Sequence, residues 1–420
     1  MPAKKKTKAK QPAGNTAGGF VFADPKPTPD DFSGFSKQDI LADSKIKAAT
    51  HLEPFKPSRK PEVLSLDQVL PAADVTQIKA AGSIVFHTVG DTGGIKEPSK
   101  QFAVADALAN DLDGKNYAKG RPAFFYHLGD VVYYLGQERY YYDQFYDPYR
   151  DYDGPIFAIP GNHDGMTSPS LGQKSLAGFV DNFCTKTPEK DAEAQQFART
   201  TMTQPGVYFT LDAPFVKIIG LYSNTSEGGT EGVISGKVVG NAQLTFLQQQ
   251  LQTASQQRNN GDRRALIIAV HHPPFTGSAD HAPSSNVLRD LDGACDAAGI
   301  LPDMVLSGHA HMYERYTRFV GTTQIPFVVA GMGGYFNLGG FKRISKKPPV
   351  PAPVPPITES DYKNNKVTMK AYDDLTFGYL RVTVTPTTIK STFVTVDPDT
   401  RAIAEKDPFT VDLNHHTVTP

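Results

Sequence analysis

Short apolar runs alternate with amphipathic stretches along the middle of the chain. Runs rich in β-branched and aromatic residues predict strands at 83–89, 123–128, 155–159, 264–270, 304–306 and 327–330. Apolar residues recur at helical spacing over 101–112, 242–254 and 287–298. Strands that alternate with helices are typical of an α/β protein with parallel strands. Two further runs, 206–211 and 215–221, predict a hairpin around a Pro-containing turn.

The two ends of the chain depart from this pattern. Prolines interrupt almost every candidate element before residue 79, so we expect 1–78 to be a largely irregular extension with a basic, disordered start. One large domain is expected over 79–400, with a proline-rich loop at 346–357 inside it, followed by a tail at 401–420. Two late alternating runs, expected to close that domain, are 375–384 and 388–396.

Composition narrows the class of protein. Lys and Arg number 43 against 44 Asp and Glu, so a strongly basic nucleic-acid binder is excluded on overall charge, and we expect no nucleic-acid partner. The two cysteines, Cys184 and Cys295, form no CxxC motif. No apolar stretch approaches the ~18 residues of a membrane span. No signal peptide is visible, so we expect a cytoplasmic location, with a secreted or periplasmic one left open.

Polar side chains follow five of the predicted strands. The loops read GDTGG with Asp91, GDVVY with Asp130 and Tyr133, GNHD with Asn162 and His163, VHHPP with His271 and His272, and GHAH with His309 and His311. Each loop alone has an ordinary explanation as a turn or a helix cap. Six of the 11 histidines lie on or beside these loops, however, and ligands gather at the carboxyl ends of strands in α/β sheets.

Carboxylates, an amide, a phenol and imidazoles make a mixed oxygen and nitrogen ligand set without thiolates. The absence of thiolates argues against a structural zinc site. Oxygen ligands combined with imidazoles suit iron, manganese or zinc. One carboxylate can bridge two cations about 3.5–4 Å apart, and such a pair clamps a phosphoryl group and deprotonates a water. The loops therefore predict a dinuclear metal site for phosphate-ester chemistry.

In this order the motifs GDxG, GDxxY, GNHD, His-x-Pro and GHxH resemble the signature of calcineurin-like metallophosphoesterases. Tyr133, three residues after Asp130, and the run GHAHMYER at 308–315 resemble the purple acid phosphatase-like branch. The resemblance spans residues 83 to about 334. The resemblance implies an α/β fold, in the form of an α+β sandwich: two mixed sheets flanked by helices, in four layers. It also implies that 79–400 is the catalytic domain.

The resemblance also implies a ligand set for two metal ions per chain. The first, Fe(III) in this family, would be held by Asp91, Asp130, Tyr133 and His311. The second, Fe(II), zinc or manganese, would be held by Asp130 as the bridge, Asn162, His271 and His309. Three histidines would act on the substrate: His163 as a contact, His281 as the candidate general acid, and His272 as its weaker rival.

The implied activity is that of an acid phosphatase-like hydrolase. It would cleave phosphate monoesters by attack of a metal-bound hydroxide and release inorganic phosphate. A phosphodiesterase of the same superfamily, acting on cyclic nucleotides or lipid diesters, is the alternative, and Tyr133 favours the monoesterase. A binding scaffold with dead metal sites is disfavoured because all seven ligand positions carry competent residues. Tyr134 rivals Tyr133, since only one of the two can face the metals, and Glu314 is expected to pair with Arg315.

Overall fold

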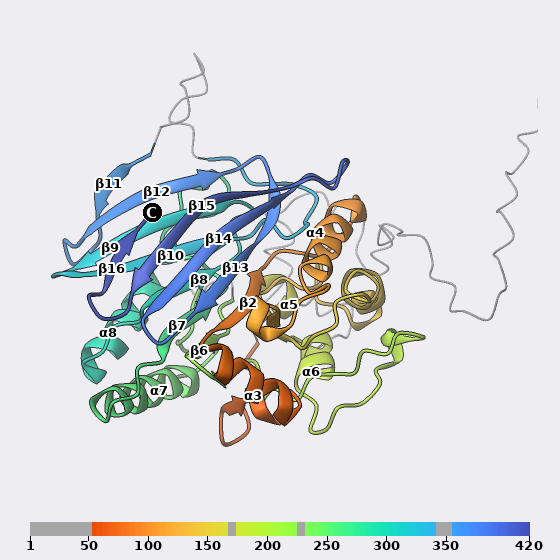
Figure 1. Ribbon diagram of the computed structural model, residues 1–420, viewed down its shortest axis with the longest axis horizontal. Helices are drawn as coiled ribbons and strands as arrows, with labels where there is room; N and C mark the ends of the chain where they lie inside the picture. The colour runs from red at the N-terminus through yellow and green to blue at the C-terminus, as the bar shows by residue number, and fades with distance from the viewer. Residues whose placement is uncertain (1–52, 167–173, 225–231, 342–354) are drawn as a thin grey trace, which may run out of the picture.

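The computed structural model describes residues 53–166, 174–224, 232–341 and 355–420. These residues form two mixed β-sheets with helices around them (Figure 1). The expected α/β class, with two mixed sheets and flanking helices, is confirmed. Among the described residues, no helix has both the length and the apolar character needed to cross a membrane.

One sheet has seven strands and carries three of the polar loops. Its order is β16 (Thr417–Thr419), β15 (Ile403–Asp412), β14 (Thr388–Val396), β13 (Phe377–Val384), β2 (Ile84–Val89), β3 (Pro122–His127) and β4 (Ile156–Ala158). Strands β2, β3 and β4 are parallel, whereas β13 pairs with β2 in the antiparallel sense. The loops that follow the three parallel strands therefore leave the sheet at the same edge.

The other sheet has nine strands and carries the remaining two loops. Its order is β1 (Val63–Ser65), β5 (Phe209–Ala213), β6 (Val216–Leu221), β7 (Ala265–Val270), β8 (Met304–Ser307), β10 (Thr323–Ala330), β9 (Tyr313–Val320), β12 (Lys366–Asp373) and β11 (Ile357–Ser360). Strands β6, β7, β8 and β10 are parallel. The loops after β7 and β8 thus also share an edge.

The helices cover the sheets from different sides. Helices α7 (Ala242–Asn259) and α8 (Ser285–Ala298) lie together at the lower left of Figure 1, and α3 (Ala72–Ala81) lies at the bottom centre. Helices α4 (Pro98–Asn110), α5 (Asn162–Gly165) and α6 (Ala177–Phe183) lie toward the right. Helix α4 packs against β13 and β14, and α7 packs against β6. Gly299 ends α8 with a left-handed φ of 63°, as expected, because glycine adopts that conformation without strain.

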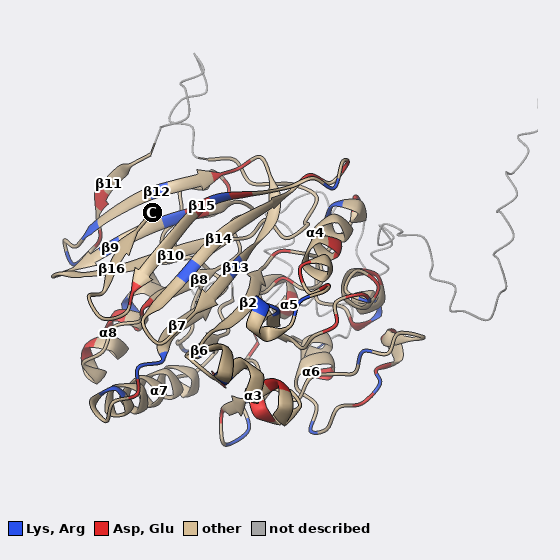
Figure 2. Ribbon diagram, viewed as in Figure 1, with Lys and Arg blue, Asp and Glu red and all other residues tan. Residues whose placement is uncertain are grey.

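Aromatic pairs join the two sheets through a shared core. Tyr126 of β3 stacks on Phe209 of β5 with ring centroids 6.4 Å apart. Tyr313 of β9 stacks on Phe393 of β14 at 4.5 Å. All four side chains are buried, so the sheets are held together by large apolar surfaces. Residues of both charge signs are interspersed along the ribbon in Figure 2.

The expected tail at 401–420 is wrong, because most of it forms β15 and β16. Strand β15 pairs with β14 along its length, but most of its first six residues are exposed and Pro408 stands near its middle. Pro408 lies between Lys406 and Phe409, where the register with β14 shifts, and a proline is tolerated at such a bulge. The apolar alternation that reveals a half-buried strand is therefore missing from this part of the sequence.

The expectation of a largely irregular extension at 1–78 is also only partly correct. Within it, β1 pairs with β5, and α3 starts directly after Pro71. Proline at a helix start costs nothing, because the N–H it lacks would have no partner there. The basic start and residues 346–354 of the proline-rich loop lie outside the described residues, and the division into domains stays a prediction.

Candidate functional site

Five strand ends meet at one place, three from the seven-stranded sheet and two from the nine-stranded sheet. The side chains at these ends are almost completely buried. Tyr133 Oη donates a hydrogen bond to Asp91 Oδ1 at 3.2 Å and lies 3.3 Å from His311 Nε2. His311 Nε2 is in turn 3.6 Å from Asp91 Oδ1. Three of the predicted ligands of the first metal thus surround one point.

A second group lies beside the first. Asp130, His271 and His309 each offer one ligand atom, and these atoms lie within 4.8 Å of one another, which is compatible with a bound metal ion. His271 Nε2 is 3.4 Å from Asp130 Oδ2 and 3.9 Å from Asp91 Oδ1, so it links the two groups. Asn162 follows Gly161, where any added Cβ would collide with the Asp130 carboxylate.

Two buried atoms at this site fit a cation. Asn162 Oδ1 and His271 Nε2 make no hydrogen bond with any described residue. A buried polar atom without a partner costs about 1–3 kcal/mol, and coordination would remove that cost. His271 Nδ1 donates to Leu128 O at 2.8 Å and His311 Nδ1 to Asn337 O at 3.1 Å, which leaves each Nε2 lone pair directed at the site. The donor set therefore fits the metal ions that the family motifs imply.

Three of the predicted ligands have a strained backbone. Asp91, Asp130 and His309 have φ values of 56°, 55° and 67°, in the left-handed region that non-glycine residues avoid. Each such residue costs on the order of 1–3 kcal/mol and is retained only where the surroundings enforce it. His309 N donates to Asp91 Oδ2 at 2.8 Å, and this bond between loops of different sheets is one such constraint.

Neighbouring charges move the pKa values of the two buried carboxylates apart. Burial, together with the charge of Asp130, raises the pKa of Asp91 well above its usual value. Burial opposes ionisation of Asp130 as well, but the charges of His271 and His163 outweigh it and lower the pKa of Asp130. Burial lowers the pKa of His309, and it lowers that of His311 to about 3. Burial opposes protonation of His271 too, but the charges of Asp130 and Asp91 outweigh it and raise the pKa of His271 to about 9, so this imidazole gives up a proton when it binds a metal. Neutral imidazoles are the form that binds metals.

The three predicted substrate histidines lie around this centre. His163 Nδ1 donates to Tyr134 O at 2.8 Å, and its backbone N–H donates to Asp130 Oδ1 at 2.9 Å. The His281 ring is half-buried, with its centroid 4.3 Å from that of His309. The His272 ring lies 4.1 Å from that of His309, but it is buried and its Nδ1 is 2.8 Å from Ser223 Oγ. Access to solvent therefore favours His281 over His272 as a proton donor.

The two neighbouring tyrosines differ in environment. Tyr133 is completely buried against Asp91 and His311, whereas Tyr134 is half-buried. The expected pairing of Glu314 with Arg315 is wrong. Successive residues of β9 point to opposite faces, so Glu314 Oε1 accepts from Gly277 N at 2.7 Å, while Arg315 binds the carboxylate on β15.

Several further residues support the site, and Gln144 among them gave no signal in the sequence. Gln144, on a π-helical segment at Tyr142–Tyr146 (η4), bonds both backbone groups of Tyr133. Asp164 accepts hydrogen bonds from Val131 N, Val132 N and Gly161 N and so joins the loops after β3 and β4. His127 Nδ1 accepts from Gly129 N at 3.1 Å while its Nε2 contacts Thr92. Only the aspartate belongs to a quoted motif, the last letter of GNHD.

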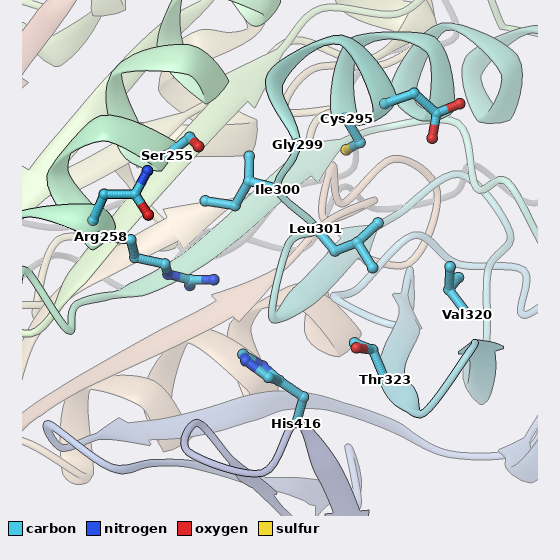
Figure 3. Close-up of a pocket in the computed structure, with 11 residues that line it drawn as sticks. Ser255, Arg258, Cys295, Gly299, Ile300, Leu301, Val320, Thr323 and His416 are labelled. Carbon is cyan, nitrogen blue, oxygen red and sulfur yellow. The ribbon is translucent and has the colours of Figure 1, made fainter.

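A separate cavity of about 520 Å³ lies elsewhere (Figure 3). Arg258, Cys295 and His416 are among the residues that line it. Ile300 and Leu301 of its wall precede β8, whereas His309 follows that strand. The cavity is therefore at the opposite edge of the sheet and takes no part in the candidate site.

The comparison with protein-family models agrees with the motifs. The model of the calcineurin-like phosphoesterase family matches residues 85–313, more than half of the chain. No curated protein sequence matches the chain. Among solved structures, GAP50, described as the anchor in the inner membrane complex of Plasmodium, is 13% identical with a TM-score of 0.48, over 77% of this chain and 89% of that one. PhoD is 14% identical with a TM-score of 0.47, over 80% of this chain and 71% of its own.

Proposed function

The chain belongs to the calcineurin-like phosphoesterase family, and we propose that it is a phosphate monoesterase of the purple acid phosphatase-like branch. The observation that carries this proposal is the position of Tyr133. Its hydroxyl lies within hydrogen-bonding distance of both Asp91 and His311. A phenol in contact with a carboxylate and an imidazole suits a ferric ion, which prefers hard anionic oxygen ligands.

Two metal ions would be held by the residues described above. Asp91, Tyr133 and His311 would bind the first, Asn162, His271 and His309 the second, and Asp130 both. When bound, they would neutralise phosphoryl charge and lower the pKa of a water molecule.

The remaining chemistry would be carried by histidines of the chain. His163 Nδ1 donates to Tyr134 O, so the ring must also carry a proton on Nε2 for that atom to donate to a phosphoryl oxygen. Hydrolysis forms a bond between the water oxygen and phosphorus and breaks the ester P–O bond. The leaving oxygen needs a proton, and half-buried His281 beside His309 is the group we assign to supply it.

Phosphate release from matched esters tests this function. The purified protein is loaded with iron and then with the second metal, which is iron, zinc or manganese. It is assayed with phenyl phosphate and with bis-phenyl phosphate. We expect the monoester to be hydrolysed with the higher kcat/KM. A clear preference for the diester would assign the chain to the phosphodiesterase alternative, and no hydrolysis of either would refute catalysis.

A further inference from the structure

Aromatic side chains border the candidate site on its solvent side. Tyr134, Tyr335 and Phe336 are all half-buried, and we call these three residues the aromatic rim. Tyr335 is the central member, because its ring centroid lies 4.3 Å from that of Tyr133 and 4.5 Å from that of His311. The aromatic rim is therefore in direct contact with two predicted ligands of the first metal.

Hydrogen bonds fix the backbone of the rim. Tyr335 N donates to Asp91 O at 2.9 Å, and Lys100 Nζ donates to Phe336 O at 2.9 Å. The Tyr134 ring stands nearly perpendicular to that of Tyr335, with an interplanar angle of 82° and centroids 6.4 Å apart. A surface that is already ordered loses little conformational freedom when a ligand packs on it, so more of the contact energy contributes to binding.

The rim also has a cationic edge. Lys96 Nζ lies 4.5 Å from the centre of the Phe336 ring, at the distance of a cation–π contact. The Lys96 side chain is exposed. An aromatic surface with a positive edge is suited to an organic ring that enters together with an anionic group.

We propose that the aromatic rim binds the leaving group, and that the substrates are phosphate monoesters whose alcohol carries an aromatic ring. This inference rests on the proposed monoesterase function. The Tyr335 ring touches both Tyr133 and His311, so a ring packed on it lies next to the position of the phosphoryl group. Offset or edge-on ring pairs are favourable beyond their buried area, to an extent that corresponds to about 2- to 10-fold in affinity.

The experiment compares benzyl phosphate with cyclohexylmethyl phosphate on the metal-loaded full chain. The two alcohols have similar size and acidity, and only one has a π-system. We expect kcat/KM to favour the benzyl ester by about 2- to 10-fold. Tyr335→Leu should bring this ratio close to one, whereas Tyr335→Phe, which keeps the ring, should preserve it. Equal kcat/KM values in the wild type, or an unchanged ratio in Tyr335→Leu, would overturn the proposal.

Binding without turnover separates this inference from the proposed function. Benzylphosphonate and cyclohexylmethylphosphonate cannot be hydrolysed, and their affinities are measured by calorimetry on the same proteins. A preference for benzylphosphonate that depends on Tyr335, in a protein that hydrolyses no ester, would support the rim and refute the monoesterase. Hydrolysis of monoesters without any preference for a ring, in binding or turnover, would refute the rim and leave the monoesterase standing.

Discussion

The side chain of Gln144 makes two hydrogen bonds with the backbone of Tyr133. Its Oε1 accepts from Tyr133 N at 2.8 Å, and its Nε2 donates to Tyr133 O at 2.9 Å. Gln101 Nε2 donates in turn to Gln144 O at 2.6 Å. The π-helical turn that carries Gln144 is a rare conformation, of a kind often found near functional sites. The two hydrogen bonds from Gln144 therefore hold the backbone of Tyr133, the proposed iron-binding tyrosine, in position.

We predict that Gln144→Leu destabilises the protein and disturbs the tyrosine–iron contact. Tyr133 N and O would be left buried without partners, which should lower the free energy of unfolding by about 1–3 kcal/mol. The visible absorption per bound iron should shift or weaken. The measurements are denaturant unfolding, an absorption spectrum and iron analysis, with the exposed Gln248→Leu on α7 as the control. An unchanged spectrum per iron would show that Gln144 does not position Tyr133.

Asp130→Ala should remove both metals, because this carboxylate is the proposed bridge. Without the cations, turnover should fall by about three orders of magnitude or more, since metal ions contribute several kcal/mol to such reactions. Asp113→Ala changes an exposed carboxylate beyond α4 and serves as the control. Metal analysis and phosphate release provide the readouts, and two metals retained in Asp130→Ala would refute the bridge.

His281→Ala should lower kcat by about 10²- to 10⁴-fold and leave the metal content intact. The loss should be larger for alkyl esters than for 4-nitrophenyl phosphate, whose leaving group needs no proton. The exposed His415→Ala is the matched control. Loss of metal in His281→Ala would identify this residue as a ligand instead, and an equal loss for both esters would exclude it as the acid.

Stability should depend on pH through Glu314. Burial, reinforced by the charge of Asp374, raises the pKa of this carboxyl to about 7. The folded state therefore holds the proton more tightly than the unfolded state, so Glu314 stabilises most below its ordinary pKa and loses this contribution as pH rises toward 7. Glu314→Gln stays neutral at every pH. The Tm of the wild type, relative to that of this variant, should fall between pH 5 and pH 8. Parallel Tm curves for the two proteins would contradict the shift.

The elements nearest the site could be predicted from sequence more readily than the outer ones. Strands such as β2 and β7 are buried on both faces, so their sequences are largely apolar and are followed directly by glycine or histidine. Strand β15 could not be predicted, because its exposed first half carries charged residues and is followed by Pro408. Candidate ligands could be named because their motifs stand directly at strand ends.

The supporting contacts could not be predicted from sequence. The pairing of Gln144 with Tyr133 depends on an irregular turn, and neither residue type signals it. Arg315 binds Asp407, which is far away in the sequence, because the two sheets bring β9 and β15 together. Contacts of this kind are set by the tertiary structure, and local sequence patterns carry no information on them.

The central claim is that Tyr133 binds ferric iron in a dinuclear site. Metal analysis of the purified protein, together with its visible absorption spectrum, tests it most directly. We predict two metal ions per chain, at least one of them iron, and a broad visible band that disappears in Tyr133→Phe. A colourless protein that contains no iron and is active only with added manganese would contradict the claim.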